Sequence, residues 1–287
     1  MKKNRKAVKT RQIIMGCLAM AGLFFAGSVF AGSASSVSAS NGSTLSRISD
    51  SVYAYVGTSD DSASNSFGAN AGIIIGKDSV LVVDTLISNK KAKAFIKDIQ
   101  AITDKPIRFV VNTHSHVDHS YGNNAFAKLG AIIISHRDSK KDMERVSQKI
   151  LDKADIYMGL NKQQMEGTQI VYPQFTFTGQ MEIDLGGLKV VLDRVAHSHS
   201  KGSVFVYIPG RKVLFAGDIL FTEYYVNMGS SNIDGWAKTI DHLMGLDINH
   251  IIPGHGPLSE KKHLADMRDY LFIFDEKAKE LSTSNSD

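Results

Sequence analysis

The chain has 287 residues, of which 43% are apolar, and its formal net charge is +4. Residues 1–31 hold six of the 33 Lys and Arg residues and no Asp or Glu, so the remainder carries 27 basic against 29 acidic residues, a net charge of −2, and a basic surface for nucleic acid is not expected. The single cysteine, Cys17, lies in the same segment, which excludes disulfides, a thiol nucleophile and thiolate metal ligands from residues 32–287.

The N-terminal segment has the pattern of a secretory signal peptide. Basic residues up to Arg11 precede an apolar run over residues 13–30, and small residues then predict cleavage after Ala31, with Ala39 as a second candidate. Glycines interrupt this apolar run, which favours a cleaved signal peptide over a retained membrane anchor. A lipoprotein signal ending at Cys17 is also not favoured, because only about five apolar-type residues separate Arg11 from Cys17. We therefore expect a signal peptide at 1–31 and a protein in the periplasm or secreted, without stable membrane insertion.

The rest of the chain predicts one domain. Residues 32–46 are rich in Ser, Gly and Ala and are expected to form a flexible tether, followed by a domain over residues 47–287. In the first half, strands are predicted at 52–55, 71–75, 80–83, 107–111 and 131–134, a helix at 91–102, and a helical segment from 138 to 159 that could form a flap. In the second half, strands are predicted at 175–177, 188–192, 203–208, 213–216 and 250–252, a helix from its cap Asp234 to Met244, and a last helix at 259–279. This order fits an α/β fold with two mixed sheets and helices outside, an αββα sandwich.

Four candidate metal ligands directly follow the predicted strand at 107–111. The sequence from residue 114 reads His114-Ser115-His116-Val117-Asp118-His119. In extended backbone the side chains alternate, so His114, His116 and Asp118 would point to one side, whereas His119 needs a bend to join them. Imidazoles and carboxylates at this density indicate a metal site.

Three further candidates stand where later predicted strands end. They are His199, Asp218 after Gly217, and His255 within Pro253-Gly254-His255-Gly256. Each alone is weak evidence, since Gly-Asp and Pro-Gly sequences usually form turns, but together with the histidine cluster they indicate one metal centre on loops. His197 competes with His199 for one position, and the spacing of His136, His242, His250 and His263 indicates structural roles.

This order of motifs, His-x-His-x-Asp-His, His199, Gly-Asp and Gly-His-Gly, resembles the metallo-β-lactamase superfamily over roughly residues 51–270. The resemblance implies the four-layer αββα fold. It also implies one zinc ion on His114, His116 and His199 and a second on Asp118, His119 and His255, with Asp218 bridging the two. The Lys-Gly-Ser sequence after residue 200 matches the family pattern, which favours His199 over His197. Asp84 resembles the carboxylate that fixes a ligand imidazole in this family.

The resemblance further implies an exported zinc-dependent hydrolase, with residues 47–287 as its hydrolase domain. Two zinc ions would provide a hydroxide that attacks a carbonyl group, and Asp118 would act as the catalytic residue that orients the water. The expected substrate is a small molecule with an ester, lactone, thioester or β-lactam amide bond. The loop at 223–234, with Tyr224 and Tyr225, is expected either to line the substrate cleft or to pack under the following helix.

Departures from known branches of the family leave alternatives open. The best-known β-lactamases carry a cysteine at the position of Asp218 and a substrate-anchoring Lys three residues later, where this chain has Phe221. The quorum-signal lactonases share the ligand set but place a Tyr at that position. A β-lactamase proper, an iron-dependent enzyme like the sulfur dioxygenases, and a non-catalytic metal-binding protein remain alternatives.

Overall fold

The computed structural model of the chain describes residues 36–38, 44–56 and 68–284. The predicted signal peptide, Cys17 and both candidate cleavage sites lie outside these residues. Among the helices that are described, none combines the length and the apolar character needed to cross a membrane.

The first sheet has eight strands that follow one another in sequence order. They are β1 (Ser36–Ser38), β2 (Thr44–Arg47), β3 (Val52–Val56), β4 (Ala71–Ile75), β5 (Val80–Val83), β6 (Ile107–Asn112), β7 (Ile132–His136) and β8 (Phe175–Phe177). Neighbours from β1 to β5 pair antiparallel, whereas β5 to β8 run parallel. Parallel strands end at the same edge of a sheet, so Asp84 and the histidine cluster, which follow β5 and β6, are placed side by side.

The second sheet has five strands in the order β13-β12-β11-β10-β9. They are β9 (Gln180–Asp184), β10 (Lys189–Asp193), β11 (Phe205–Ile208), β12 (Val213–Phe221) and β13 (His250–His255). The pairs from β9 to β12 are antiparallel, and β13 pairs parallel with β12. The parallel pair places Asp218 of β12 near His255, the last residue of β13.

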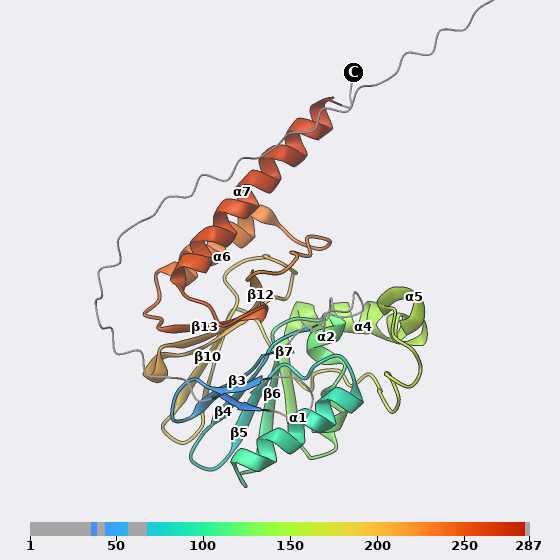
Figure 1. Ribbon diagram of the computed structural model, residues 1–287, viewed down its shortest axis with the longest axis vertical. Coiled ribbons are helices and arrows are strands. Elements are labelled where there is room, and N and C mark those ends of the chain that lie inside the picture. The colour runs from blue at the N-terminus through green and yellow to red at the C-terminus, as the bar shows by residue number, and fades with distance from the viewer. Residues whose placement is uncertain (1–35, 39–43, 57–67, 285–287) are drawn as a thin grey trace, which may run out of the picture. The chain divides into compact units, whose positions relative to one another are not determined.

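The described α-helices flank the sheets, and all but the last connect strands (Figure 1). They are α1 (Asn89–Ile102), α2 (Val117–Ser120), α3 (Asn123–Ala127), α4 (Arg137–Asp152), α5 (Ala154–Met158), α6 (Ile233–Met244) and α7 (Lys261–Ser284). The predicted cap of α6 was wrong: the Asn232 side chain, not that of Asp234, accepts the hydrogen bond from the Gly235 N–H, at 2.7 Å. Asp234 lies in the first turn, where its negative charge is stabilised by the positive end of the helix dipole.

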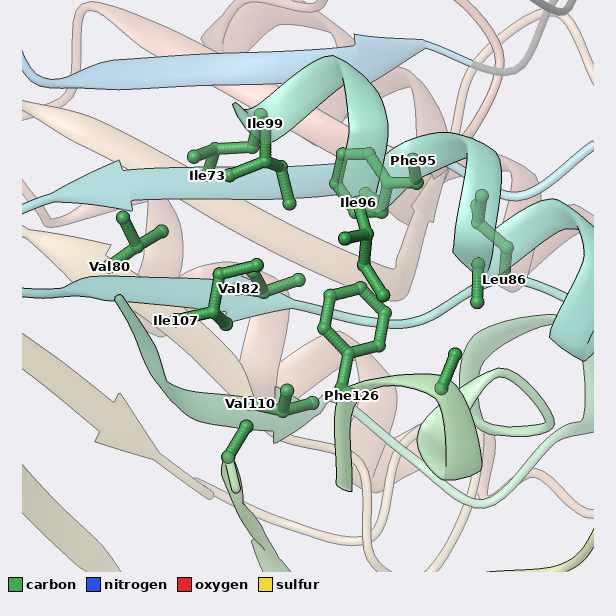
Figure 2. Packing of buried hydrophobic residues seen from close by; sticks show 14 of the residues in the cluster. Ile73, Val80, Val82, Leu86, Phe95, Ile96, Ile99, Ile107, Val110 and Phe126 are labelled. Carbon is green, nitrogen blue, oxygen red and sulfur yellow. The ribbon is translucent and has the colours of Figure 1, made fainter. Parts of the chain in front are cut away.

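Three of the four apolar clusters in the described residues separate the layers of the fold. One lies between the first sheet and its helices, where Phe95 of α1 and Phe126 of α3 cover Val82 (Figure 2). A second joins the two sheets, with Leu81 on the first and Phe215 on the second. A third lies between the second sheet and the helices α6 and α7 and contains Trp236, Leu243 and Leu264.

Strand residues alternate between these cores, since side chains of a strand point to opposite faces in turn. On β5, Val80 and Val82 enter the first core while Leu81 and Val83 enter the second. On β12, Leu214 enters the third core beside Phe215, which enters the second. The predicted αββα sandwich is therefore confirmed, and the continuous apolar runs of these strands are explained by burial of both faces.

Some predicted boundaries differ from the structure. The strand β9 was not predicted, and the helical segment at 138–159 is divided into α4 and α5. Residues 44–46, predicted to belong to the flexible tether, form part of β2, and Leu45 is buried in the first core. The pairing of β2 with β3 supplies backbone partners that the composition of this segment does not reveal.

Candidate metal centre

The first four predicted ligands follow β6 as expected. Extended backbone was expected as far as Asp118, but the chain already bends at His116. His116 has φ −66° and ψ 156° and is the N-cap of α2, so Asp118 and His119 both lie in the first turn of this short helix. His114, Asp118 and His119 are buried, and His116 is partly exposed. The helical turn brings Asp118 and His119 to the centre from a direction different from that of His114.

Asp218 projects from a bulge inside β12. The strand was predicted to end at Ala216, but it continues to Phe221. Its pairing with β13 shifts register on both sides of Gly217. Gly217 has φ +52°, and a Cβ at this position would lie 2.8 Å from atoms of the Thr113 side chain. A bulge of this kind redirects a side chain, and glycine permits the required backbone and the close contact.

His199, from a loop, and His255, from the end of β13, complete the cluster. His199 is buried in the loop between β10 and β11, and its Nδ1 donates to the backbone carbonyl of Asn227 at 3.0 Å. His197 turns away from the cluster, and its Nε2 donates to the Ser230 carbonyl at 2.8 Å. The His255 ring stacks on Phe221, with centroids 5.3 Å apart, and on Tyr224, with centroids 4.8 Å apart.

The seven predicted ligands form two neighbouring groups of donor atoms. In each group the atoms lie within 4.8 Å of one another; the first contains His114, His116, His199 and Asp218, and the second contains Asp118, His119 and His255. Asp218 faces both groups: its Oδ2 lies 3.3 Å from Nε2 of His199, and its Oδ1 lies 3.1 Å from Nε2 of His119. One carboxylate oxygen is thus directed toward each group.

Hydrogen bonds behind the imidazoles orient them toward the centre. His119 Nδ1 donates to Asp84 Oδ2 at 2.8 Å, and His114 Nδ1 donates to Thr113 Oγ1 at 3.1 Å. The Thr113 N–H and hydroxyl in turn donate to the two Asp84 oxygens, each at 2.7 Å. With Nδ1 occupied as a donor, the Nε2 lone pairs of His114 and His119 face the centre, which is the orientation of metal-binding histidines. The position of Asp84, expected from the resemblance, agrees with this role.

The charges at the centre favour a bound cation. Burial raises the pKa of Asp218, but the histidines around it, His119 and His255 foremost, outweigh burial and hold that pKa well below its ordinary value. Burial lowers the pKa of His255, but the carboxylates, Asp218 first, raise it to about 9. Burial and the neighbouring His114 lower the pKa of His116 to about 4, and burial keeps the pKa of His199 well below its ordinary value. Ionised carboxylates therefore stabilise positive charge beside neutral imidazoles.

The same residues pass a test of fit for a metal. Nε2 of His114 and Oδ1 of Asp218 are buried and make no hydrogen bond within the described part of the chain. Nε2 of His199 lies 3.0 Å from Nδ1 of His116, and Nε2 of His119 lies 3.4 Å from Nε2 of His255. Buried ring nitrogens and carboxylate oxygens that converge at these distances need protons or a metal cation between them. The five imidazoles and two carboxylates therefore fit a metal-binding centre.

Sequence reasoning missed several groups that support the centre. Thr113 stands next to His114 in the motif, so its position was a usable signal. The carbonyl of Asn227 acts through the backbone and leaves no side-chain signal. Of the two tyrosines whose placement the sequence left open, Tyr224 stacks on His255, whereas Tyr225 is 96% exposed. His136, expected to be structural, caps α4 by accepting from the Asp138 N–H at 3.1 Å.

Replacing Gly254 by Ala is expected to weaken metal binding about tenfold, because the new Cβ would lie 2.0 Å from Oδ1 of Asp218 and 2.7 Å from the backbone carbon of Gly217, so that the carboxylate and the bulge that carries it must shift. Gly210→Ala is the matched control, since a Cβ there meets nothing within 4 Å. Metal titrations of both variants, with circular dichroism to verify folding, provide the measurement. Equal affinity in Gly254→Ala and in the control would show that the carboxylate position does not depend on this glycine.

Comparisons with known proteins give consistent results. The sequence profile described as "Metallo-beta-lactamase superfamily" matches residues 65–255. The chain is 24% identical over 227 residues to a linear primary-alkylsulfatase from Pseudomonas sp., and the match covers 68% of this chain but 43% of the sulfatase. It is 25% identical over 197 residues to the alpha subunit of a 2,4-dinitroanisole O-demethylase from Nocardioides sp., covering 67% of this chain and 54% of that subunit. The chain thus spans about half the length of these two relatives.

A solved structure shows the same fold. A metallo-β-lactamase from Pontibacter korlensis superposes with a TM-score of 0.65 over 80% of this chain and 98% of that protein. The sequence identity of 18% means that this likeness speaks for the fold alone.

Proposed function

The chain belongs to the metallo-β-lactamase superfamily, and we propose that it is an exported dinuclear zinc hydrolase that cleaves ester-type bonds of small molecules. The observation that supports this most is the Asp218 carboxylate, which directs one oxygen to each of the two donor groups. His114, His116 and His199 would hold one zinc ion, Asp118, His119 and His255 the other, and Asp218 would bridge them. When bound, such a pair supplies Lewis acidity and lowers the pKa of a coordinated water.

Asp118 is the proposed catalytic residue. Its Oδ2 lies 3.3 Å from Nε2 of His255 and 3.7 Å from Nε2 of His119. Although burial raises the pKa of Asp118, the neighbouring His119 and His255 hold it at about 2. At neutral pH this carboxylate is therefore ionised, and it can accept a hydrogen bond from the attacking water and so orient it.

The other groups of the centre position these residues. Asp84 fixes the ring of His119, and the Asn227 carbonyl fixes the ring of His199. Phe221 and Trp236 lie against His199, with ring centroids at 5.7 and 5.4 Å, and form an apolar wall behind it. A rigid apolar wall keeps water away from the ligand and strengthens the electrostatic interactions at the centre.

The relatives broaden the bond types to be tested. One is named an alkylsulfatase and another an O-demethylase, so esters of sulfuric acid and aryl ethers join carbonyl esters, lactones and thioesters as candidates. A β-lactamase proper is less consistent with this chain. Phe221 stands three residues after Asp218, is buried and stacks on His255, so this position offers no cation to anchor a substrate.

Export is proposed from the sequence pattern of residues 1–31 alone. Mass spectrometry of the N-terminal peptide of the secreted or periplasmic protein is expected to find a start at residue 32 or 40. A lipid-modified Cys17 at that terminus would contradict cleavage after Ala31 or Ala39 and would indicate a membrane-anchored lipoprotein instead.

Removal of metal from the purified exported protein by a chelator is expected to abolish hydrolysis, and zinc is expected to restore it. Thiol reagents should have no effect, because Cys17 is removed with the signal peptide. The measurement combines elemental analysis with rates on lactones, aryl esters, thioesters, sulfate esters and β-lactams. Two bound zinc ions without turnover on any of these would favour a non-catalytic metal-binding protein, and tightly bound iron would favour the oxidative alternative.

A further inference from the structure

A pocket of about 510 Å³ lies between the chain at the end of β12 and the helix α7. Its wall includes Phe221, Tyr224 and Tyr225 from the first segment and Met267 and Tyr270 from the helix. This volume is in the range of small-molecule sites, which are commonly about 300–1,000 Å³ and lined by apolar and aromatic groups. No group of the proposed hydrolytic reaction requires this pocket, so its aromatic lining calls for a separate explanation.

The pocket shares part of its wall with the metal centre. Phe221 and Tyr224 line the pocket, and both also stack on His255, a member of the second donor group. Tyr224 is half-buried. Because its ring stacks on His255 and also lines the pocket, Tyr224 lies at the border between the pocket and the metal centre.

The lining indicates what the pocket would accept. Four aromatic rings, those of Phe221, Tyr224, Tyr225 and Tyr270, can pack against another ring in stacked or edge-to-face arrangements. Two carboxylates, Glu223 and Asp266, and one ammonium, Lys262, also line the pocket, and this balance disfavours a negatively charged group.

We propose that this pocket holds an uncharged aryl group of the substrate while the scissile bond lies at the metal centre. The inference rests on the proposed function, and it narrows the substrate class to esters or ethers that carry an aryl group. Tyr270 is then a specificity-determining residue, since it contributes a ring to the pocket from α7, whereas the ligands of the metal centre come from other elements.

The test measures thiol binding to the cobalt-loaded protein by the thiolate-to-cobalt absorption band. The probes are ethanethiol and phenyl-terminated thiols with one to three methylene groups. For the best phenyl thiol the ring is expected to tighten binding about 3- to 10-fold relative to ethanethiol. Tyr270→Ala should remove most of this advantage without changing the ethanethiol affinity, and Tyr270→Phe should retain it. A carboxylate on the ring of the probe should reduce binding.

Phe272→Ala is the matched control, because Phe272 is an aromatic residue of the same helix with similar exposure, 45% against 43% for Tyr270, and it does not line the pocket. It should leave both affinities unchanged. If ethanethiol binds but the ring adds no affinity, or if Phe272→Ala loses as much as Tyr270→Ala, the pocket proposal is overturned while the metal centre stands. If no thiol produces the absorption band, the proposed metal centre fails and the pocket proposal fails with it.

Discussion

Replacing Asp218 by Ala is expected to give a folded protein that binds about one zinc ion instead of two and turns over roughly 100-fold or more slowly. Its two oxygens lie 3.1 Å from Nε2 of His119 and 3.3 Å from Nε2 of His199, one in each donor group. The carboxylate offsets the repulsion between two cations and sets their separation. Without it, the positions of the water and of the developing negative charge are no longer fixed by both ions.

Asp218→Asn separates charge from shape, because it keeps the size of the side chain and removes the negative charge. It should fold as well as the parent and still lose the second metal ion. Asp247→Ala is the control, since Asp247 is a surface residue that pairs with Lys212. Metal content and kinetics are measured on one preparation of each variant. Two retained zinc ions with near-normal turnover in Asp218→Ala would show that Asp218 shapes the β12 bulge but does not bridge the two metal ions.

The positions of the donor groups could be predicted because each is encoded locally. A histidine cluster after an apolar strand, and glycine next to Asp218 and His255, are visible within a few residues of sequence. Parallel pairing of β5 with β6 and of β12 with β13 then places the strand ends together. The αββα layers fit the predicted order of strands and helices, but the periodicity of the sequence alone did not determine this topology, which the family resemblance implied.

The details that depend on distant partners could not be predicted. Gly217 and Asp218 read as a turn after Ala216, and only the register between β12 and β13 shows that they form a bulge inside a longer strand. The carbonyl that orients His199 belongs to Asn227, 28 residues away, and any residue type could supply it. Capping of α6 by Asn232 instead of Asp234 reflects the exact point at which the backbone becomes helical, which propensity does not determine to the residue.

The support beneath the metal loop is another long-range feature. Asn112 and Asn123 exchange two amide hydrogen bonds at 3.0 and 2.9 Å, and Asn112 also donates to the carbonyl of His119. Both side chains are fully buried. Asparagine usually indicates a turn, so the sequence gives no sign that this pair fixes the backbone on which Asp118 and His119 stand.

Replacing His199 by Ala is expected to reduce turnover by more than about 100-fold, whereas His197→Ala should have little effect. The magnitude for His199 should exceed the 10- to 100-fold typical of partners that only orient a metal ligand. His199 is buried, and its Nε2 lies 3.0 Å from Nδ1 of His116 within the first donor group. His197 is partly exposed and donates to the Ser230 carbonyl outside the centre, so its loss removes one loop hydrogen bond.

The two histidines are matched controls for each other, since they lie in one loop and differ by two positions. His199→Gln guards against a folding artefact, because it fills part of the space that Ala leaves beside Phe221 and Trp236, whose ring centroids lie 5.7 and 5.4 Å from that of His199. If His199 binds the metal, both His199 variants lose metal affinity and turnover while circular dichroism remains unchanged. Equal losses of turnover in the His197 and His199 variants would contradict the assignment of His199 as the metal ligand. A larger loss in His197→Ala would indicate His197 as the ligand instead. Of the two histidines, the structure favours His199. Its Nε2 faces the Asp218 carboxylate, and its Nδ1 donates to the backbone carbonyl of Asn227.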